Sequence, residues 1–156
     1  MADLSQITNF IEVAETLGTA GQPKAEQFAD IKKAGYDTVI NLAMPGEKAL
    51  PEEGTLVSRE GMVYVHIPVK WDAPQKADFD LFAKVLQAND GRRVFAHCVA
   101  NMRVSAFTFL YRIIHQGIDP AEAKKTMQQI WNPHGVWEEL VDEILRDHGI
   151  DYFDID

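Results

Sequence analysis

Cys98 and Arg103 are the two residues whose types and spacing could carry covalent chemistry. Cys98 is the only cysteine of the chain, and it stands between the apolar run 94–96 and a long apolar segment. A thiol that follows a strand and precedes a helix faces unpaired backbone N–H groups, which stabilise a thiolate. Arg103 adds a permanently charged, planar guanidinium that suits an oxyanion. The pattern predicts a nucleophile and an anion clamp in one loop, acting on phosphate or a similar group.

Neighbouring residues support this interpretation over a structural one. A lone cysteine is often an inert core residue, and Arg103 could be a surface charge. His97 precedes the cysteine, where it could fix the loop and favour the thiolate, and Ser105 could hydrogen-bond to the sulfur and ease its departure. Backbone N–H groups are predicted to line an anion cradle formed by Val99, Ala100, Asn101 and Met102.

Asp72 is the predicted general acid. It lies in the segment 70–74, directly before a helix predicted over 76–88. A departing alkoxide needs a proton, which an aspartic acid at this place could supply. A cap or turn role is the alternative. Asp78 and Asp80 are weaker candidates, because acidic residues are favoured near a helix start for purely structural reasons.

Two further ionisable residues lie near the edge where ligands of α/β proteins collect. Glu47 follows a buried strand predicted over 37–42. It could orient Arg103, but we expect a solvated loop charge instead. His66 is expected to be a hydrogen-bonded strand residue, since no partner at metal-ligand spacing accompanies it. The sequence predicts no metal ligands and no cofactor, because an arginine and backbone amides can hold the anion.

Composition and charge limit the class of protein. The chain has 156 residues, of which 46% are hydrophobic and 25% charged, so we predict a single domain, 1–156, with a sizeable core. A net charge of −9 argues against a nucleic-acid binder.

The single cysteine indicates the compartment of the protein, because it excludes internal disulfides and favours a reducing environment. Neither a signal peptide nor a membrane span is visible, so we expect a cytoplasmic protein, although a trimmed leader would leave the same sequence. The oligomeric state is not indicated.

Hydrophobic patterns predict the elements that must position the loop. Strands are predicted over 10–14, 37–42, 62–69 and 92–97, and helices over 23–34, 51–60, 76–88, 102–116, 120–131 and 136–147. Glycines and a proline predict a turn over 17–23. Helix 102–116 is apolar on nearly every side, so it should be the central buried helix and hold the loop rigid. Trp131 and Trp137 are expected to be packing residues, and the acidic tail 149–156 to be loosely held.

The motif 97–105 resembles the signature loop of the cysteine-dependent protein phosphatases, particularly the dual-specificity-like and tyrosine-specific groups. The pair at 71–72 resembles their mobile acid loop. Segments 17–23 and 39–47 are similar to a bacterial phosphatase-like branch that is sometimes fused to β-lactamase-like hydrolases. The resemblance spans about 17–145. It implies an α/β fold with a central, mostly parallel sheet of four to five strands and helices on both faces.

Two departures from that family concern the loop itself. Four residues separate Cys98 from Arg103, where the family usually has five, so Val104 stands in the arginine's customary place. Asn101 stands where glycine is usual, a mild change because asparagine tolerates a positive φ. The short spacing is also similar to that of rhodanese-type sulfurtransferases, whose cysteine carries a persulfide.

The leading prediction is hydrolysis of a phosphate monoester in two steps. Cys98 would attack phosphorus and form a cysteinyl phosphate, Arg103 and the loop amides would hold the oxygens, and Asp72 would protonate the leaving group. The partner would be a phosphorylated protein or a small phosphate ester. Two alternatives remain open: sulfur transfer through a Cys98 persulfide, and an inactive module that binds a phosphorylated partner.

Overall fold

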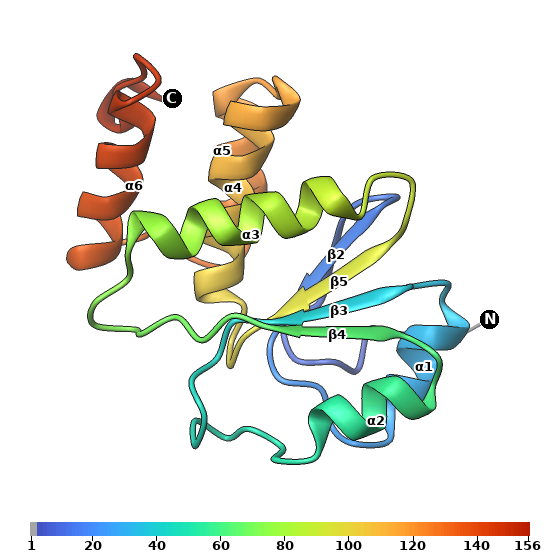
Figure 1. Ribbon diagram of the computed structural model, residues 1–156. Coiled ribbons are helices and arrows are strands. Elements are labelled where there is room, and N and C mark those ends of the chain that lie inside the picture. Colours follow the sequence, from blue (N-terminus) through green and yellow to red (C-terminus); the bar gives the residue numbers. More distant parts are fainter. Residues whose placement is uncertain (1–2) are drawn as a thin grey trace.

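A single five-stranded sheet forms the centre of the computed structural model, which describes residues 3–156 (Figure 1). The strand order is β1-β2-β5-β3-β4. The strands are β1 (Ile11–Ala14), β2 (Leu17–Ala20), β3 (Thr38–Asn41), β4 (Val63–His66) and β5 (Val94–His97). All neighbouring pairs are parallel except β1 with β2, which is antiparallel. The predicted α/β class and mostly parallel sheet are confirmed.

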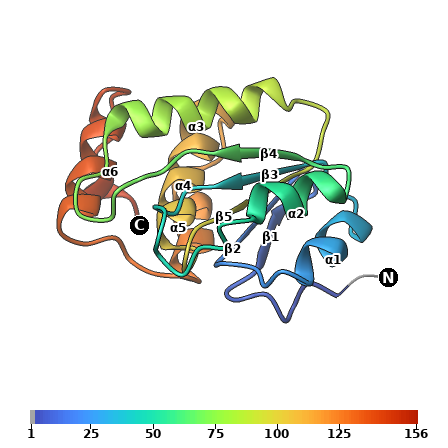
Figure 2. The same ribbon diagram turned by 60° about the horizontal axis from the view of Figure 1, so that its bottom comes forward.

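Helices cover both faces of the sheet (Figures 1 and 2). They are α1 (Gln27–Lys33), α2 (Glu53–Arg59), α3 (Lys76–Ala88), α4 (Met102–Gln116), α5 (Pro120–Gln128) and α6 (Val136–Arg146). Helices α1 and α2 lie on one face, and α3 to α6 on the other. Strand side chains alternate between the two cores: Val39 packs on the α1–α2 side, and its neighbour Ile40 on the α3–α6 side.

The predicted turn over 17–23 is wrong, because its first four residues form strand β2. All four are buried, and β2 pairs in parallel with β5. A Cβ at Gly18 would lie only 2.5 Å from the Tyr36 hydroxyl. Gly18 therefore lets the Tyr36 side chain pack closely on the sheet, and it does not mark the sharp turn that the sequence predicted.

Helix α4 is the central buried helix, as predicted, and its bounds match the prediction. Eleven consecutive residues from Arg103 to Ile113 are buried, and the helix packs on α5 and α6. Helix α3 also has the predicted bounds. Helices α1 and α5 and strand β4 are shorter than predicted.

The C-terminal tail packs on the protein, contrary to the expectation that it is loosely held. Residues Tyr152–Asp154 form a short 3-10 helix. The buried Tyr152 ring packs edge-on against Phe109, and Lys124 Nζ donates to the Ile155 carbonyl at 2.9 Å. An aromatic side chain within an acidic tail supplies enough buried apolar surface to hold it.

Parallel register places the ends of three strands at one edge of the sheet. Asn41, the last residue of β3, pairs with His97 of β5 on one side and with His66 of β4 on the other. The loops that follow these strands therefore meet at the edge where α/β proteins bind ligands. None of the helices described in residues 3–156 combines the length and apolar character needed to cross a membrane.

Candidate active site

The loop between β5 and α4 carries the only thiol of the chain. Cys98 follows β5 directly and is 1% exposed. Asn101 has a φ of 69°, which confirms that asparagine here adopts the left-handed conformation expected of the family's glycine. Its Nδ2 donates to the Asn9 carbonyl at 2.9 Å and to Thr19 Oγ1 at 3.0 Å. The loop is thereby fastened to the N-terminal segment and to β2.

Several backbone N–H groups in the loop that follows Cys98 have no hydrogen-bond partner among the described residues. Within residues 3–156 no acceptor is hydrogen-bonded to the N–H groups of Val99, Ala100, Met102, Arg103 or Val104. They stand at the N-terminus of the 15-residue helix α4, where the helix dipole favours negative charge. A cavity of about 210 Å³ opens beside them. It is lined by Glu47, Trp71, Cys98, Val99, Ala100, Met102 and Arg103.

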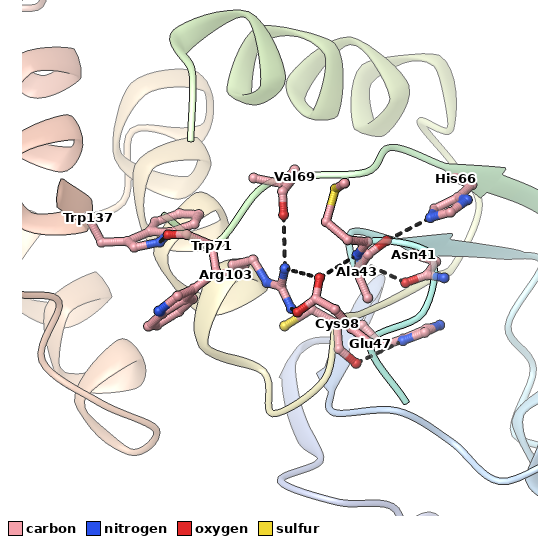
Figure 3. Close-up of polar contacts among 11 residues, drawn as sticks. Asn41, Ala43, Glu47, His66, Val69, Trp71, Cys98, Arg103 and Trp137 are labelled. Atoms are coloured by element: carbon pink, nitrogen blue, oxygen red, sulfur yellow. Dashed lines mark hydrogen bonds and ion pairs between the residues drawn. The ribbon is translucent and has the colours of Figure 1, made fainter. Parts of the chain in front are cut away.

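Glu47 holds Arg103 in a fixed orientation, so the expectation of a solvated loop charge is wrong (Figure 3). Arg103 Nη1 donates to Glu47 Oε1 at 2.9 Å and to the Val69 carbonyl at 2.8 Å, and Nη2 donates to Glu47 Oε2 at 3.0 Å. Three of the five guanidinium N–H donors are used in this way. The remaining two, one on Nε and one on Nη2, lie parallel on one edge and suit an oxyanion.

The ionisation of both partners follows from this contact. Burial disfavours the charged form of Arg103, which is 3% exposed, but hydrogen bonds and negative charge from Glu47 and Cys98 outweigh burial and raise its pKa. The Arg103 hydrogen bond, in turn, lowers the pKa of Glu47. Figure 3 shows the Cys98 sulfur beside the Arg103 guanidinium, and Cys98 is among the causes of the raised pKa of Arg103.

A buried pair of ionisable side chains lies behind the cysteine. His97 Nδ1 bonds to the Cys98 carbonyl at 3.1 Å, and Nε2 bonds to Glu53 Oε2 at 2.6 Å. A carbonyl can only accept, so Nδ1 carries a proton. Gln22 Nε2 donates to the other Glu53 oxygen at 2.8 Å.

Glu53 is a site residue that the sequence interpretation missed. It is 1% exposed on α2, although glutamate is almost never buried without a partner. The sequence shows it only as one of two adjacent glutamates in a short, polar helix, which gives no signal of burial. For Glu47 a signal existed, namely its place after a parallel strand at the ligand-binding edge.

Asp72 is exposed and is not among the residues that line the Cys98 cavity. Its neighbour Trp71 does line that cavity, and its ring packs against Trp131 and Trp137. Trp137 Nε1 also donates to the Trp71 carbonyl at 2.7 Å (Figure 3). The loop that carries Asp72 is therefore fastened at the rim of the cavity, and its role as an acid stays a prediction.

Other predicted residues have structural partners. Ser105 Oγ donates to the Met102 carbonyl at 3.0 Å, so a hydrogen bond to sulfur requires its hydroxyl to change partner. Val104 is fully buried in the core, so the arginine and not the residue after it faces the cavity. Asp78 closes a capping box with Gln75 at the start of α3, and His66 Nε2 bonds to the Ala43 carbonyl at 2.7 Å, as expected of a strand histidine.

Comparison with known proteins identifies the family. No family model matches the chain. A Shewanella putrefaciens crystal structure named "Putative phosphatase (DUF442)" is 34% identical, with a TM-score of 0.84 over 94% of this chain and 97% of that one. Curated "Beta-lactamase hydrolase-like" proteins of Xylella fastidiosa and Agrobacterium fabrum are 25% and 28% identical over 129 residues. These residues are 80% of this chain but only 29% of those proteins.

A more distant structure shares the fold alone. The P. aeruginosa protein TpbA, solved in complex with pTyr, has a TM-score of 0.65 and 22% identity, over 95% of this chain and 85% of that one. The predicted resemblance is confirmed by the Shewanella match, which extends over nearly the whole chain. The chain belongs to the DUF442 family, whose Shewanella putrefaciens member is named a putative phosphatase, and it is similar to the β-lactamase hydrolase-like proteins over part of their length.

Proposed function

We propose that this protein hydrolyses phosphate monoesters through a phosphoryl group carried on Cys98. The observation that carries the proposal is that Arg103 and Cys98 line one cavity, where Glu47 and the Val69 carbonyl hold the guanidinium and leave its Nε/Nη2 edge without a protein oxygen as acceptor. An arginine edge of this kind binds two oxygens of a phosphate side by side. The unpaired N–H groups of the loop supply further donors to the same anion.

The reaction takes place in two steps. In the first, the Cys98 thiolate attacks phosphorus, the ester P–O bond breaks, and the leaving oxygen takes a proton from Asp72. In the second, water attacks phosphorus, the S–P bond breaks, and Asp72 accepts the proton that water loses. Arg103 and the loop amides stabilise the equatorial oxygens in both transition states.

The surroundings of Cys98 suit the attack of its sulfur on an anionic substrate. The N-terminus of α4 and the Arg103 guanidinium place positive charge in front of the sulfur. His97 fixes the main chain behind it through the Cys98 carbonyl. Glu47 occupies the Nη1/Nη2 edge of Arg103, so the adjoining Nε/Nη2 edge remains available to the substrate.

Three variants test the assignment of roles, with an aryl phosphate such as p-nitrophenyl phosphate as substrate. Cys98→Ser should abolish turnover, whereas undiminished turnover would refute the proposal. Arg103→Lys should lower kcat/KM by at least tenfold, because an ammonium cannot offer two parallel donors. Asp72→Asn should lower kcat, whereas Asp80→Asn, an exposed aspartate on α3, is the matched control.

The cavity supports an aryl or alkyl monophosphate as substrate. Trp71 and Met102 are apolar members of its lining, and such side chains suit the organic part of an ester. A phosphorylated protein and a small phosphate ester both satisfy this chemistry. TpbA, which shares the fold, has been solved with pTyr bound, so phosphotyrosine is the first peptide substrate to assay.

Sulfur transfer is the second candidate, and the four-residue spacing between Cys98 and Arg103 favours it. Val104, which stands where the longer phosphatase loop would have its arginine, is buried in the core. With thiosulfate, the Cys98 thiolate would attack the outer sulfur, form a persulfide and release sulfite. Mass spectrometry after incubation with thiosulfate decides the matter, because only sulfur transfer adds one sulfur atom to Cys98.

The third candidate function is a module that binds a phosphorylated partner without hydrolysing it. Asp72→Ala separates it from the enzyme. In a phosphatase the substitution slows hydrolysis strongly, whereas in a pure binding module there is no hydrolysis to slow and the affinity for a phosphopeptide is nearly unchanged. Measuring turnover and binding on the same variant gives both results.

A further inference from the structure

A second, larger cavity lies at the same edge of the sheet as the Cys98 cavity. Its volume is about 960 Å³, against about 210 Å³ for the cavity beside the thiol. One wall is α2, with Gly54, Ser58 and Arg59, and the strands β3 and β4 contribute Asn41, Tyr64 and His66. We call it the α2 cavity. Its size is that of a binding site for a sizeable organic group.

The lining of the α2 cavity is free of acidic residues. The chain has 24 aspartates and glutamates and a net charge of −9, yet the cavity is bordered by Arg59 and His66 and by no carboxylate. Arg59 is exposed, and none of the ion pairs found among residues 3–156 involves it. The net negative charge of the protein repels anions, but the lining of this cavity carries no negative charge and is therefore suited to bind an anion.

The α2 cavity and the Cys98 cavity share the loop that orients Arg103. Pro45 and Gly46 line the α2 cavity, and the next residue, Glu47, lines the Cys98 cavity. Figure 3 shows Asn41 and His66 on the far side of Ala43 from Arg103. A molecule whose phosphoryl group sits beside Cys98 can therefore extend across this loop into the α2 cavity.

The floor of the α2 cavity is also connected to the cysteine loop. Asn41 Nδ2 donates to the Tyr64 hydroxyl at 3.1 Å. Burial and the neighbouring Glu53 carboxylate raise the pKa of Tyr64, which keeps that hydroxyl protonated. Glu53 bonds to His97, and His97 to the Cys98 carbonyl. The polar groups that an occupant would meet are thus part of the network that supports the thiol.

We propose that the α2 cavity recognises a second anionic group on the phosphate ester whose phosphoryl group enters the Cys98 cavity. This inference rests on the proposed phosphatase function and adds a substrate class to it: phosphate esters that carry a further carboxylate or phosphate. Arg59 is the specificity-determining residue, because it is the permanent cation of the cavity. The second anion belongs either to an acidic phosphopeptide or to a small bisphosphorylated molecule.

The test compares two charge reversals. Arg59→Glu alters the α2 cavity, whereas Arg92→Glu lies before β5 at the opposite edge of the sheet and lines a different cavity. Both change the net charge of the chain equally, so any general repulsion of anions is the same. The substrates are a phosphotyrosyl peptide flanked by glutamates, the same peptide flanked by glutamines, and an aryl phosphate with and without a second phosphate.

We expect wild type to prefer the doubly anionic member of at least one pair. Arg59→Glu should reduce that preference, expressed as a ratio of kcat/KM values, by about fivefold, as expected for reversing one exposed charge. Arg92→Glu should leave the ratio unchanged. A preference confined to the peptides identifies a polypeptide substrate, and one confined to the aryl phosphates identifies a small molecule.

Equal effects of the two reversals, or no preference in either pair, would overturn the inference while leaving the phosphatase function intact. If no substrate is hydrolysed, the phosphatase function fails instead. The inference is then decided by the binding of the same peptides and aryl phosphates to the Cys98→Ser protein. Weaker binding of the doubly anionic ligand after adding Arg59→Glu, and not after Arg92→Glu, supports the α2 cavity as an anion site, and equal binding refutes it.

Discussion

Glu53→Ala should destabilise the protein far more than its place in a short helix suggests. The carboxylate accepts hydrogen bonds from His97 at 2.6 Å and from Gln22 at 2.8 Å, and its side chain is 2% exposed. Removing it leaves His97 Nε2 and the Gln22 amide buried without these partners. Breaking a buried ion pair from one side costs about 3–5 kcal/mol.

Glu53→Gln should be much milder. A glutamine can still accept from Gln22 and can donate to a neutral His97, so the hydrogen bonds remain and only the charges are lost. The expected cost is about 1–2 kcal/mol. In a chain of this length 1 kcal/mol corresponds to roughly 2–4 °C in Tm. Glu53→Ala should therefore lower Tm by roughly 6–20 °C and Glu53→Gln by roughly 2–8 °C.

Thermal unfolding followed by circular dichroism measures both values, and Glu52→Ala is the matched control. Glu52 is the preceding residue, is exposed, and makes no side-chain cap hydrogen bond, so its loss should change Tm by no more than about 2 °C. If Glu53→Ala costs no more than Glu52→Ala, the pair with His97 does not support the cysteine loop. Alkylation of Cys98 by iodoacetamide in Glu53→Gln then reports whether the charge of the pair matters for thiol reactivity.

Three other predictions concern the loop and the tail. Glu47→Gln should destabilise the protein at neutral pH, because the Arg103 hydrogen bond lowers the pKa of Glu47 and so stabilises the folded state. The difference in unfolding free energy between wild type and variant is complete above pH 4.5, the ordinary pKa of a glutamate, and vanishes as the pH falls further. A difference in unfolding free energy that does not depend on pH would contradict this. Asn101→Val should cost about 1–2 kcal/mol or more in chemical denaturation because of its φ of 69°, with Asn101→Gly closer to wild type. Tyr152→Ala should cost about 2–4 kcal/mol, whereas a neutral result would restore the expectation of a loose tail.

Sequence patterns predicted the elements whose structure is determined locally. Helix α4 combines a continuous apolar run with Gly117 at its end, in the left-handed conformation typical of a helix terminus. Helix α3 has an amphipathic pattern and a capping box closed by Asp78. The strained position in the loop was also predictable, because asparagine is among the few residues that tolerate a positive φ.

Residues whose environment depends on distant partners were not predictable. Strand β2 resembles a turn because Gly18 lacks a side chain, yet the sheet needs that space for Tyr36. Glu53 is separated from His97 by 44 positions in sequence, and Glu47 from Arg103 by 56. Nothing local marks Glu53 as buried, and the place of Glu47 after a strand indicates the ligand-binding edge but not its partner. Both pairings arise only when α2 and the β3–α2 loop pack beside β5 and α4.

Trapping of the covalent intermediate tests the central claim most directly. Wild-type protein is mixed with a phosphate monoester, quenched in acid within the first turnover, digested and analysed by mass spectrometry. The proposed function predicts a phosphoryl group on the peptide that carries Cys98, and none on the same peptide from Cys98→Ser. Hydrolysis of the ester without any phosphoryl group on Cys98, or a sulfur-loaded Cys98 in a protein that hydrolyses no phosphate ester, would contradict it.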